Sequence, residues 1–129
     1  MTHHWPIRVY YEDTDLAGIV YYANYLKFIE RARSEMVRDL GIDQAALKAT
    51  QDIVFAVRRV EADYRAPAKF DDELVVETKI LRASPVRLEL SQDVMRAGTV
   101  IFAAKVTLAT INGQGGVAKL PPEMLSKFC

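Results

Sequence analysis

Three acidic residues, Glu12, Asp13 and Asp15, stand within the stretch YEDTDLAGIVYYANY at residues 11–25. A small turn containing glycine and then an apolar run follow them. Carboxylates at this density can hold a metal ion, transfer phosphate, cap a solvated turn or supply one reactive group. Each use requires different neighbours, so the surrounding residues distinguish between them.

A calcium loop is disfavoured by the residues at its ligand positions. Asp13 and Asp15 would occupy the first two ligand positions of an EF-hand loop, and Gly18 would be its glycine. Ala17 and Asn24 then fall at later ligand positions, including that of the bidentate glutamate. The preceding strand is also too polar for a phosphate-transfer aspartate, which would follow a buried parallel strand.

Two interpretations of the acids therefore stay open. Glu12 and Asp13 suit a solvated turn, in which carboxylates accept hydrogen bonds from nearby backbone N–H groups. Asp15 differs, because small and apolar residues follow it at 16–20. A carboxylate at the edge of such a segment can be partly desolvated, which alters its reactivity. Asp15 is therefore the candidate reactive residue.

A long helix is predicted directly after this turn, from Asn24 to Leu40. Gly41 suits the left-handed position that ends many helices. Asn24 is expected to cap the helix, and Glu30 and Arg33 to form a surface pair. Apolar residues recur at steps of three and four and so share one helix face: Tyr25, Ile29, Ala32, Met36 and Leu40.

Shorter elements surround this helix. Residues 43–50 are predicted to form one or two further helical turns with Asp43 as N-cap, and PPEMLSKF a final turn. Strands are predicted at 7–11, 53–65, 73–82, 86–95 and 100–111. Consecutive strands with short links favour an antiparallel sheet, and the long amphipathic helix must cover one of its faces. The predicted fold class is α+β, as one domain over residues 1–129.

The amino-acid composition limits which binding partners and which cellular compartment are expected. The 17 basic and 17 acidic residues balance, which argues against general affinity for nucleic acid or anionic membrane. The single cysteine, Cys129, permits no internal disulfide and no cysteine-rich metal site. Neither a signal peptide nor a transmembrane segment is evident, so a soluble cytoplasmic protein is predicted. His3 and His4 are expected at a frayed polar terminus.

The segment YEDTDLAGIVYYANYLKFIERARSEMVRDLGI resembles the signature of the hotdog-fold acyl-CoA thioesterases. It is most similar to the 4-hydroxybenzoyl-CoA and the Tol–Pal-associated thioesterase groups, and VEADYRAPAKFDDELVVET resembles their central strands. The resemblance implies one long helix wrapped by an antiparallel sheet, and a homodimer or homotetramer with sites at the subunit interface. It also implies hydrolysis of an acyl-CoA thioester without a metal or redox cofactor.

The resemblance also assigns site residues. It carries the catalytic aspartate onto Asp15, and the helix N–H that receives the thioester carbonyl onto Tyr22. Unpaired N–H donors at a helix start stabilise the charge that develops on an attacked carbonyl oxygen. Asp15 would act as nucleophile or as general base on water. Arg82 and Ser84, in the turn LRASPVR, are the candidate contacts to coenzyme A phosphates.

At one position this chain departs from the pattern of the Tol–Pal-associated group, and that position bears on the choice of substrate. Many Tol–Pal-associated members have a histidine where this chain has Tyr22, whereas the 4-hydroxybenzoyl-CoA group has tyrosine. The Tyr22 side chain is expected to pack under the helix. An acyl carrier protein thioesterase and a non-catalytic acyl-binding module stay as alternatives, because the fold does not fix the function. A dehydratase would require a site histidine, for which His3 and His4 are not placed.

Overall fold

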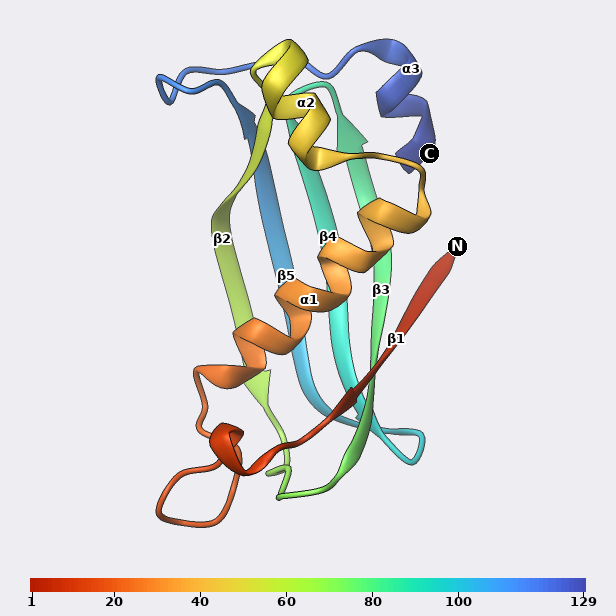
Figure 1. The fold of residues 1–129 in the computed structure, drawn as a ribbon. Coiled ribbons are helices and arrows are strands. Elements are labelled where there is room, and N and C mark those ends of the chain that lie inside the picture. The colour runs from red at the N-terminus through yellow and green to blue at the C-terminus, as the bar shows by residue number, and fades with distance from the viewer.

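The computed structural model describes all residues from Met1 to Cys129. Figure 1 shows the elements in chain order: β1 (Thr2–Arg8), η1 (Tyr11–Asp13), α1 (Asn24–Asp39), α2 (Gln44–Gln51), β2 (Val54–Tyr64), β3 (Glu73–Ser84), β4 (Arg87–Arg96), β5 (Thr99–Ile111), α3 (Pro122–Leu125) and η2 (Ser126–Phe128). None of the helices combines the length and the apolar character that crossing a bilayer requires.

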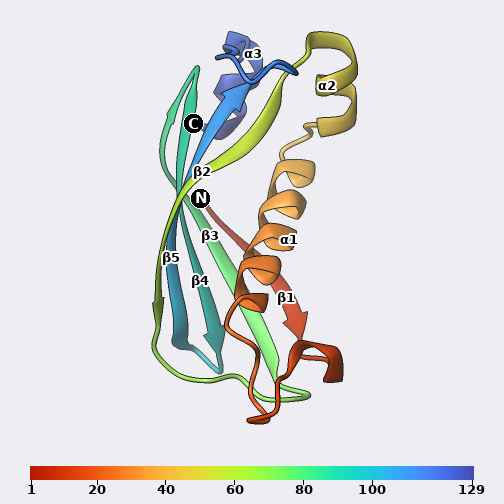
Figure 2. The ribbon, with the colours of Figure 1, turned by 90° about the vertical axis from the view of Figure 1, so that its left-hand side faces the viewer.

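The strands form one five-stranded antiparallel sheet in the order β1-β3-β4-β5-β2. Helix α1 crosses one face of this sheet diagonally, from the end of β2 at its start toward β3 at its end (Figure 1). Figure 2 shows the opposite face of the sheet without a covering helix. The predicted α+β arrangement, one long helix against an antiparallel sheet, is confirmed.

The core lies between α1 and the sheet, and it follows from the two periodicities in the sequence. The helix buries the predicted stripe, including Ile29 and Met36, and Gly41 at φ +83° follows its end as predicted. Alternate residues of β4 and β5, such as Leu90 and Val106, are fully buried against it. Asp43 caps α2 as predicted, accepting a hydrogen bond from the Ala46 N–H at 3.0 Å.

Two predictions about the strands are wrong. β1 begins at Thr2, because this segment pairs with β3 and sets His3 opposite Thr78. The His3 side chain is therefore 11% exposed rather than frayed, with its Nε2 2.8 Å from Asp39 Oδ2. β2 and β3 are not neighbours either, because β2 pairs with β5. Residues 65–72 therefore cross from one edge of the sheet toward the other (Figure 1).

The predicted surface pair of Glu30 and Arg33 is also wrong. Glu30 accepts a hydrogen bond from Ser34 Oγ at 2.9 Å. Arg33 is half-buried and donates from Nη1 to Gln92 Oε1 at 2.9 Å. Gln92 is fully buried on β4 and donates to Thr78 Oγ1 at 3.1 Å and to a helix carbonyl of α1. A polar network therefore crosses the middle of the core.

Candidate active site

Asp15 lies in a tight reversal between η1 and α1. The Gly18 N–H donates to the Asp15 carbonyl at 3.0 Å, and the Asp15 N–H donates to the Ile19 carbonyl at 3.0 Å. Gly18 has φ +79°, a conformation that glycine adopts without steric cost. The Asp15 carboxylate accepts one hydrogen bond, from the Ala17 N–H at 2.9 Å. The side chain is exposed in the single chain, so the predicted partial desolvation is not seen there.

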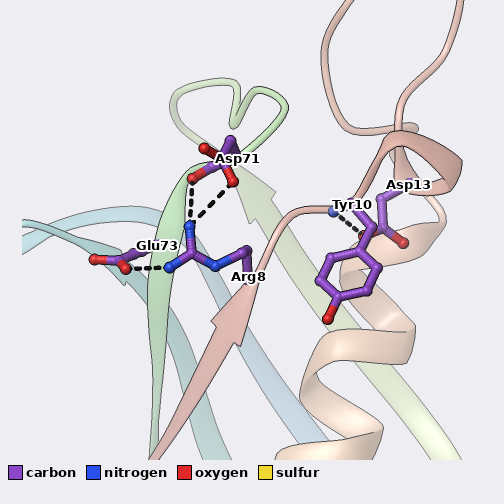
Figure 3. Close-up of polar contacts among 5 residues, drawn as sticks. All are labelled: Arg8, Tyr10, Asp13, Asp71 and Glu73. Atoms are coloured by element: carbon purple, nitrogen blue, oxygen red, sulfur yellow. Dashed lines mark hydrogen bonds and ion pairs between the residues drawn. The ribbon is translucent and has the colours of Figure 1, made fainter.

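Asp13 anchors this reversal. Its carboxylate accepts a hydrogen bond from a nearby backbone N–H as expected, but the residue is buried, so the expected solvation is wrong. The residue is 8% exposed, and its Oδ2 accepts a hydrogen bond from the Tyr10 N–H at 2.8 Å (Figure 3). Its carbonyl accepts two more, from the Tyr21 N–H and from Asn24 Nδ2, both at 2.9 Å. Asn24 therefore does not cap the helix as predicted. It ties the first turn of α1 to the acidic segment.

The crossing segment 65–72 forms hydrogen bonds with the reversal and with the first turn of α1. The Val20 N–H donates to the Ala68 carbonyl at 2.8 Å, and the Ala68 N–H donates to the Tyr25 hydroxyl at 3.0 Å. Arg8 on β1 binds Asp71 and Glu73, which fixes the far end of the segment (Figure 3). These residues were not predicted as part of the site, because they meet only through the sheet order.

The Asp72 carboxylate fixes the crossing segment 65–72 by binding a cationic side chain and a backbone N–H. Its Oδ2 accepts hydrogen bonds from Arg96 Nη1 and from the Lys69 N–H, both at 2.9 Å. Burial alone would raise the pKa of Asp72, but the Lys69 N–H and the Arg96 guanidinium outweigh it and lower the pKa. Arg96 also donates to the Pro67 carbonyl at 2.9 Å, so it links β4 to the segment.

The start of α1 presents unpaired backbone donors next to this reversal. The Asn24 N–H donates to the Tyr21 carbonyl at 2.8 Å, but the N–H groups of Tyr22 and Ala23 have no acceptor. The positive end of the helix dipole adds to the field there. The Tyr22 phenol raises the pKa of Tyr21, and the Asp15 carboxylate adds to the shift. The link between the acidic segment and the helix start is the Asp13 carbonyl, which accepts from the Tyr21 N–H and from Asn24 Nδ2.

A cavity of about 340 Å³ opens beside the helix start. Its lining is mostly apolar or aromatic, and it includes Ile19, Tyr22 and Tyr64. The Tyr64 hydroxyl donates to the Tyr22 carbonyl at 2.9 Å, and the two rings lie 6.3 Å apart. Tyr22 is 63% exposed, so the prediction that its side chain packs under the helix is wrong. Tyr22 lines this cavity, whereas Asp15 does not and lies in the reversal that precedes the helix start.

Arg82 and Ser84 lie at the opposite end of the sheet. β3 runs from Glu73, near the acidic reversal, to Ser84, and its residues advance about 3.3 Å each, for a total on the order of 35 Å. Ser84 Oγ donates to the Arg87 carbonyl at 3.3 Å within the turn, while Arg82 is exposed. One chain therefore does not bring these residues to Asp15 and Tyr22.

An antiparallel sheet against one long central helix, with a carboxylate just before the helix start, is the arrangement of hotdog-fold proteins. The chain belongs to the Thioesterase superfamily, whose family profile matches residues 17–103. Tyr22, Arg82 and Ser84 lie inside the matched segment, and Asp15 lies just before it.

Relatives and solved structures agree with this assignment. The chain is 40% identical over 124 residues to the acyl-CoA thioester hydrolase YbgC of Escherichia coli O6:H1, covering 95% of this chain and 89% of the relative. A probable thioesterase from Bartonella henselae is 36% identical with a TM-score of 0.89, covering 94% of this chain and 100% of that chain. An aspartate-to-asparagine mutant of 4-hydroxybenzoyl CoA thioesterase has a TM-score of 0.92, covers 99% of each chain and, at 20% identity, shows the fold alone.

Proposed function

We propose that this protein hydrolyses an acyl-CoA or aryl-CoA thioester to the free acid and coenzyme A, using Asp15 and the Tyr22 N–H. The observation that carries the proposal is the position of the Asp15 loop beside a helix start whose N–H donors have no acceptor. The named activity of a relative that is 40% identical, acyl-CoA thioester hydrolase, supports this substrate class.

The chemistry follows from the charge that develops on the thioester oxygen. As the carbonyl carbon is attacked, its oxygen becomes negative, and the N–H groups of Tyr22 and Ala23 stabilise it. Asp15 acts in one of two ways. Its carboxylate attacks the carbonyl carbon, expels the coenzyme A thiolate and leaves a mixed anhydride that water then hydrolyses. Alternatively, it removes a proton from the water molecule that attacks. Neither route draws on a metal or redox cofactor.

β2 is an exposed edge strand of the sheet, and pairing of β2 with β2 of a second copy would form a homodimer. β2 has β5 as its single strand neighbour, and its apolar residues Val57, Val60 and Tyr64 are 50%, 38% and 46% exposed. An edge strand with unpaired backbone groups and apolar side chains readily pairs with another strand. A tetramer of two such dimers is the alternative. Arg82 and Ser84 can contact coenzyme A phosphates only if they serve the site of a neighbouring copy.

Two further alternatives concern the substrate and the reaction. An acyl carrier protein thioester presents the same carbonyl and the same pantetheine arm, so the reactive groups would be unchanged. An acyl-binding module would use the apolar cavity without cleaving the thioester. We favour acyl-CoA hydrolysis, because the free carboxylate of Asp15 has no structural task beyond one hydrogen bond within its own loop.

The test is thiol release from a panel of aliphatic and aromatic acyl-CoA thioesters. We expect Asp15→Asn to lower kcat by about 10²–10⁴-fold, the range for loss of an acid–base group. Glu12→Gln, an exposed acid three residues away, is the matched control and should retain wild-type activity. No thiol release by the wild type from any thioester, with acyl-CoA still bound, would favour the binding module. Full activity of Asp15→Asn would refute the site.

A further inference from the structure

The carbonyl of Tyr22, at the start of α1, accepts its hydrogen bond from a side chain and not from the helix. In a regular α-helix this carbonyl would accept from the N–H four residues further on, which is that of Leu26. The Leu26 N–H instead donates to the Ala23 carbonyl at 3.2 Å. The Tyr64 hydroxyl donates to the Tyr22 carbonyl in its place, at 2.9 Å. A residue at the end of β2 therefore completes the first turn of α1, which starts beside it (Figure 1).

The Tyr64 hydroxyl is held in a fixed direction by the packing of its ring. The ring lies edge-on to Tyr25 and Phe102, with centroid distances of 5.5 and 4.9 Å. Both of these neighbours are buried in the core, so the ring has little room to turn. Burial raises the pKa of Tyr64, and the phenols of Tyr22 and Tyr25 add to the shift. The hydroxyl therefore keeps its proton at neutral pH and is available as a donor.

The Tyr22 carbonyl and the Ala23 N–H belong to the same planar peptide group and point in opposite directions. The Ala23 N–H is one of the two donors at the helix start that have no acceptor. A hydrogen bond accepted by the carbonyl polarises the peptide group and strengthens the donor at its other end. The same bond limits rotation of the peptide plane, and donors that are fixed in place stabilise developing charge best. Tyr64 can therefore act on the Ala23 N–H without touching it.

The preceding peptide group has the same arrangement, with a backbone donor in place of the side chain. The Tyr21 carbonyl accepts from the Asn24 N–H at 2.8 Å, and the Tyr22 N–H at the other end of that peptide group has no acceptor. Both peptide groups at the helix start are thus hydrogen-bonded at the carbonyl and free at the N–H. Only the second depends on a side chain, that of Tyr64, so its contribution can be removed by one substitution.

We propose that Tyr64 is a positioning residue for thioester hydrolysis, because its hydroxyl orients and polarises the peptide group between Tyr22 and Ala23. The Ala23 N–H then binds the thioester oxygen more strongly as that oxygen becomes negative. This inference rests on the proposed function. The Tyr64 hydroxyl donates to the backbone, so in this scheme it transfers no proton and does not touch the reacting atoms.

The first test removes the hydroxyl and measures the kinetics of thiol release. We expect Tyr64→Phe to lower kcat by about 3–10-fold, the range that corresponds to the net contribution of one neutral hydrogen bond. KM should stay within about twofold, because the donor acts mainly on the charge of the transition state. Tyr11→Phe is the matched control, since Tyr11 is 83% exposed and its hydroxyl has no hydrogen-bond partner. A Tyr64→Phe protein with wild-type kcat would overturn the proposal.

The second test distinguishes a donor from a residue that only packs. A fluorine atom next to the hydroxyl makes a phenol a stronger hydrogen-bond donor and changes its size little. With 3-fluorotyrosine incorporated at position 64, kcat at neutral pH should rise above that of the wild type. The expected order of kcat is therefore phenylalanine, tyrosine, fluorotyrosine. A role in packing alone predicts no dependence on donor strength, so equal kcat for tyrosine and fluorotyrosine would contradict the proposal.

The third test observes the thioester carbonyl directly. The thioester that the wild type hydrolyses fastest is labelled with ¹³C at its carbonyl and bound to Asp15→Asn, with and without Tyr64→Phe. Weaker donors leave the carbonyl less polarised, so its infrared stretch should move to higher frequency in the double variant. An unchanged frequency would reject the role of Tyr64 and leave the proposed function standing. Failure of the proposed function is a different result, in which the wild type releases no thiol from any thioester.

Discussion

Asp13 and Asp15 lie two positions apart in the chain. Substituting each in turn should distinguish the structural role of Asp13 from the catalytic role proposed for Asp15. Asp13→Ala removes the acceptor of the Tyr10 N–H, a hydrogen bond of 2.8 Å to a carboxylate that is 8% exposed. Hydrogen bonds to charged groups contribute about 1.5–3 kcal/mol. For a chain of this size about 2 kcal/mol lowers Tm by roughly 5–10 °C. Asp13→Asn keeps an acceptor oxygen and should cost about half as much.

Activity should respond differently from stability. The two hydrogen bonds that join Asp13 to the helix start use its backbone carbonyl, so they persist in either variant. We therefore expect Asp13→Asn to keep kcat within about tenfold of wild type, whereas Asp15→Asn loses about 10²–10⁴-fold without a comparable change in Tm. Thermal melts at one fixed protein concentration and thiol release provide both numbers. An Asp13→Asn protein with wild-type Tm and no activity would refute this division of roles.

Two further predictions concern the buried Gln92–Thr78 hydrogen bond and the carboxylate of Asp72. Gln92→Leu leaves the buried Thr78 hydroxyl without its partner and should destabilise by about 1–3 kcal/mol, whereas adding Thr78→Val should recover part of the loss. Strictly additive effects in chemical denaturation of the single and double variants would contradict the network. Because the pKa of Asp72 is lowered on folding, its stabilising contribution is present above the ordinary aspartate pKa and is lost as pH falls through the folded value. Asp72→Asn should therefore lower Tm at neutral pH and converge with wild type in acid, and a constant difference between the two Tm curves would count against the assignment.

The local pattern of apolar residues was sufficient to predict the helices and strands, but not the order of the strands in the sheet. The apolar stripe and Gly41 predicted α1 to within a residue at its end, and alternation predicted β2 to β5 closely. The place of β2 beside β5 could not be read from the sequence, because it depends on pairing between residues about fifty positions apart. β1 was placed too late because His3 and His4 have no apolar alternation, and their strand conformation comes from β3.

The candidate site was predictable in part. Asp15 and Tyr22 were assigned from a family resemblance, and their roles remain predictions for the assays above. The burial of Asp13 was missed, because the carboxylates at positions 12, 13 and 15 look equally polar in sequence. Arg33 was misplaced because helical periodicity assigns charged residues to the solvent face. Its true neighbour, Gln92, is on a strand 59 residues further along the chain. No local signal connects the two.

The order of the sheet has a consequence for how the chain folds. β3, β4 and β5 are joined by hairpins, so their contacts close short loops, and each edge strand must wait for a distant partner. The β1–β3 pair spans α1, α2, β2 and the crossing segment in sequence, and the β2–β5 pair spans β3 and β4. We therefore expect the three-stranded meander of β3, β4 and β5 to form first. The edge that we assign to dimer formation is completed late, so chain assembly and the final folding step become hard to separate.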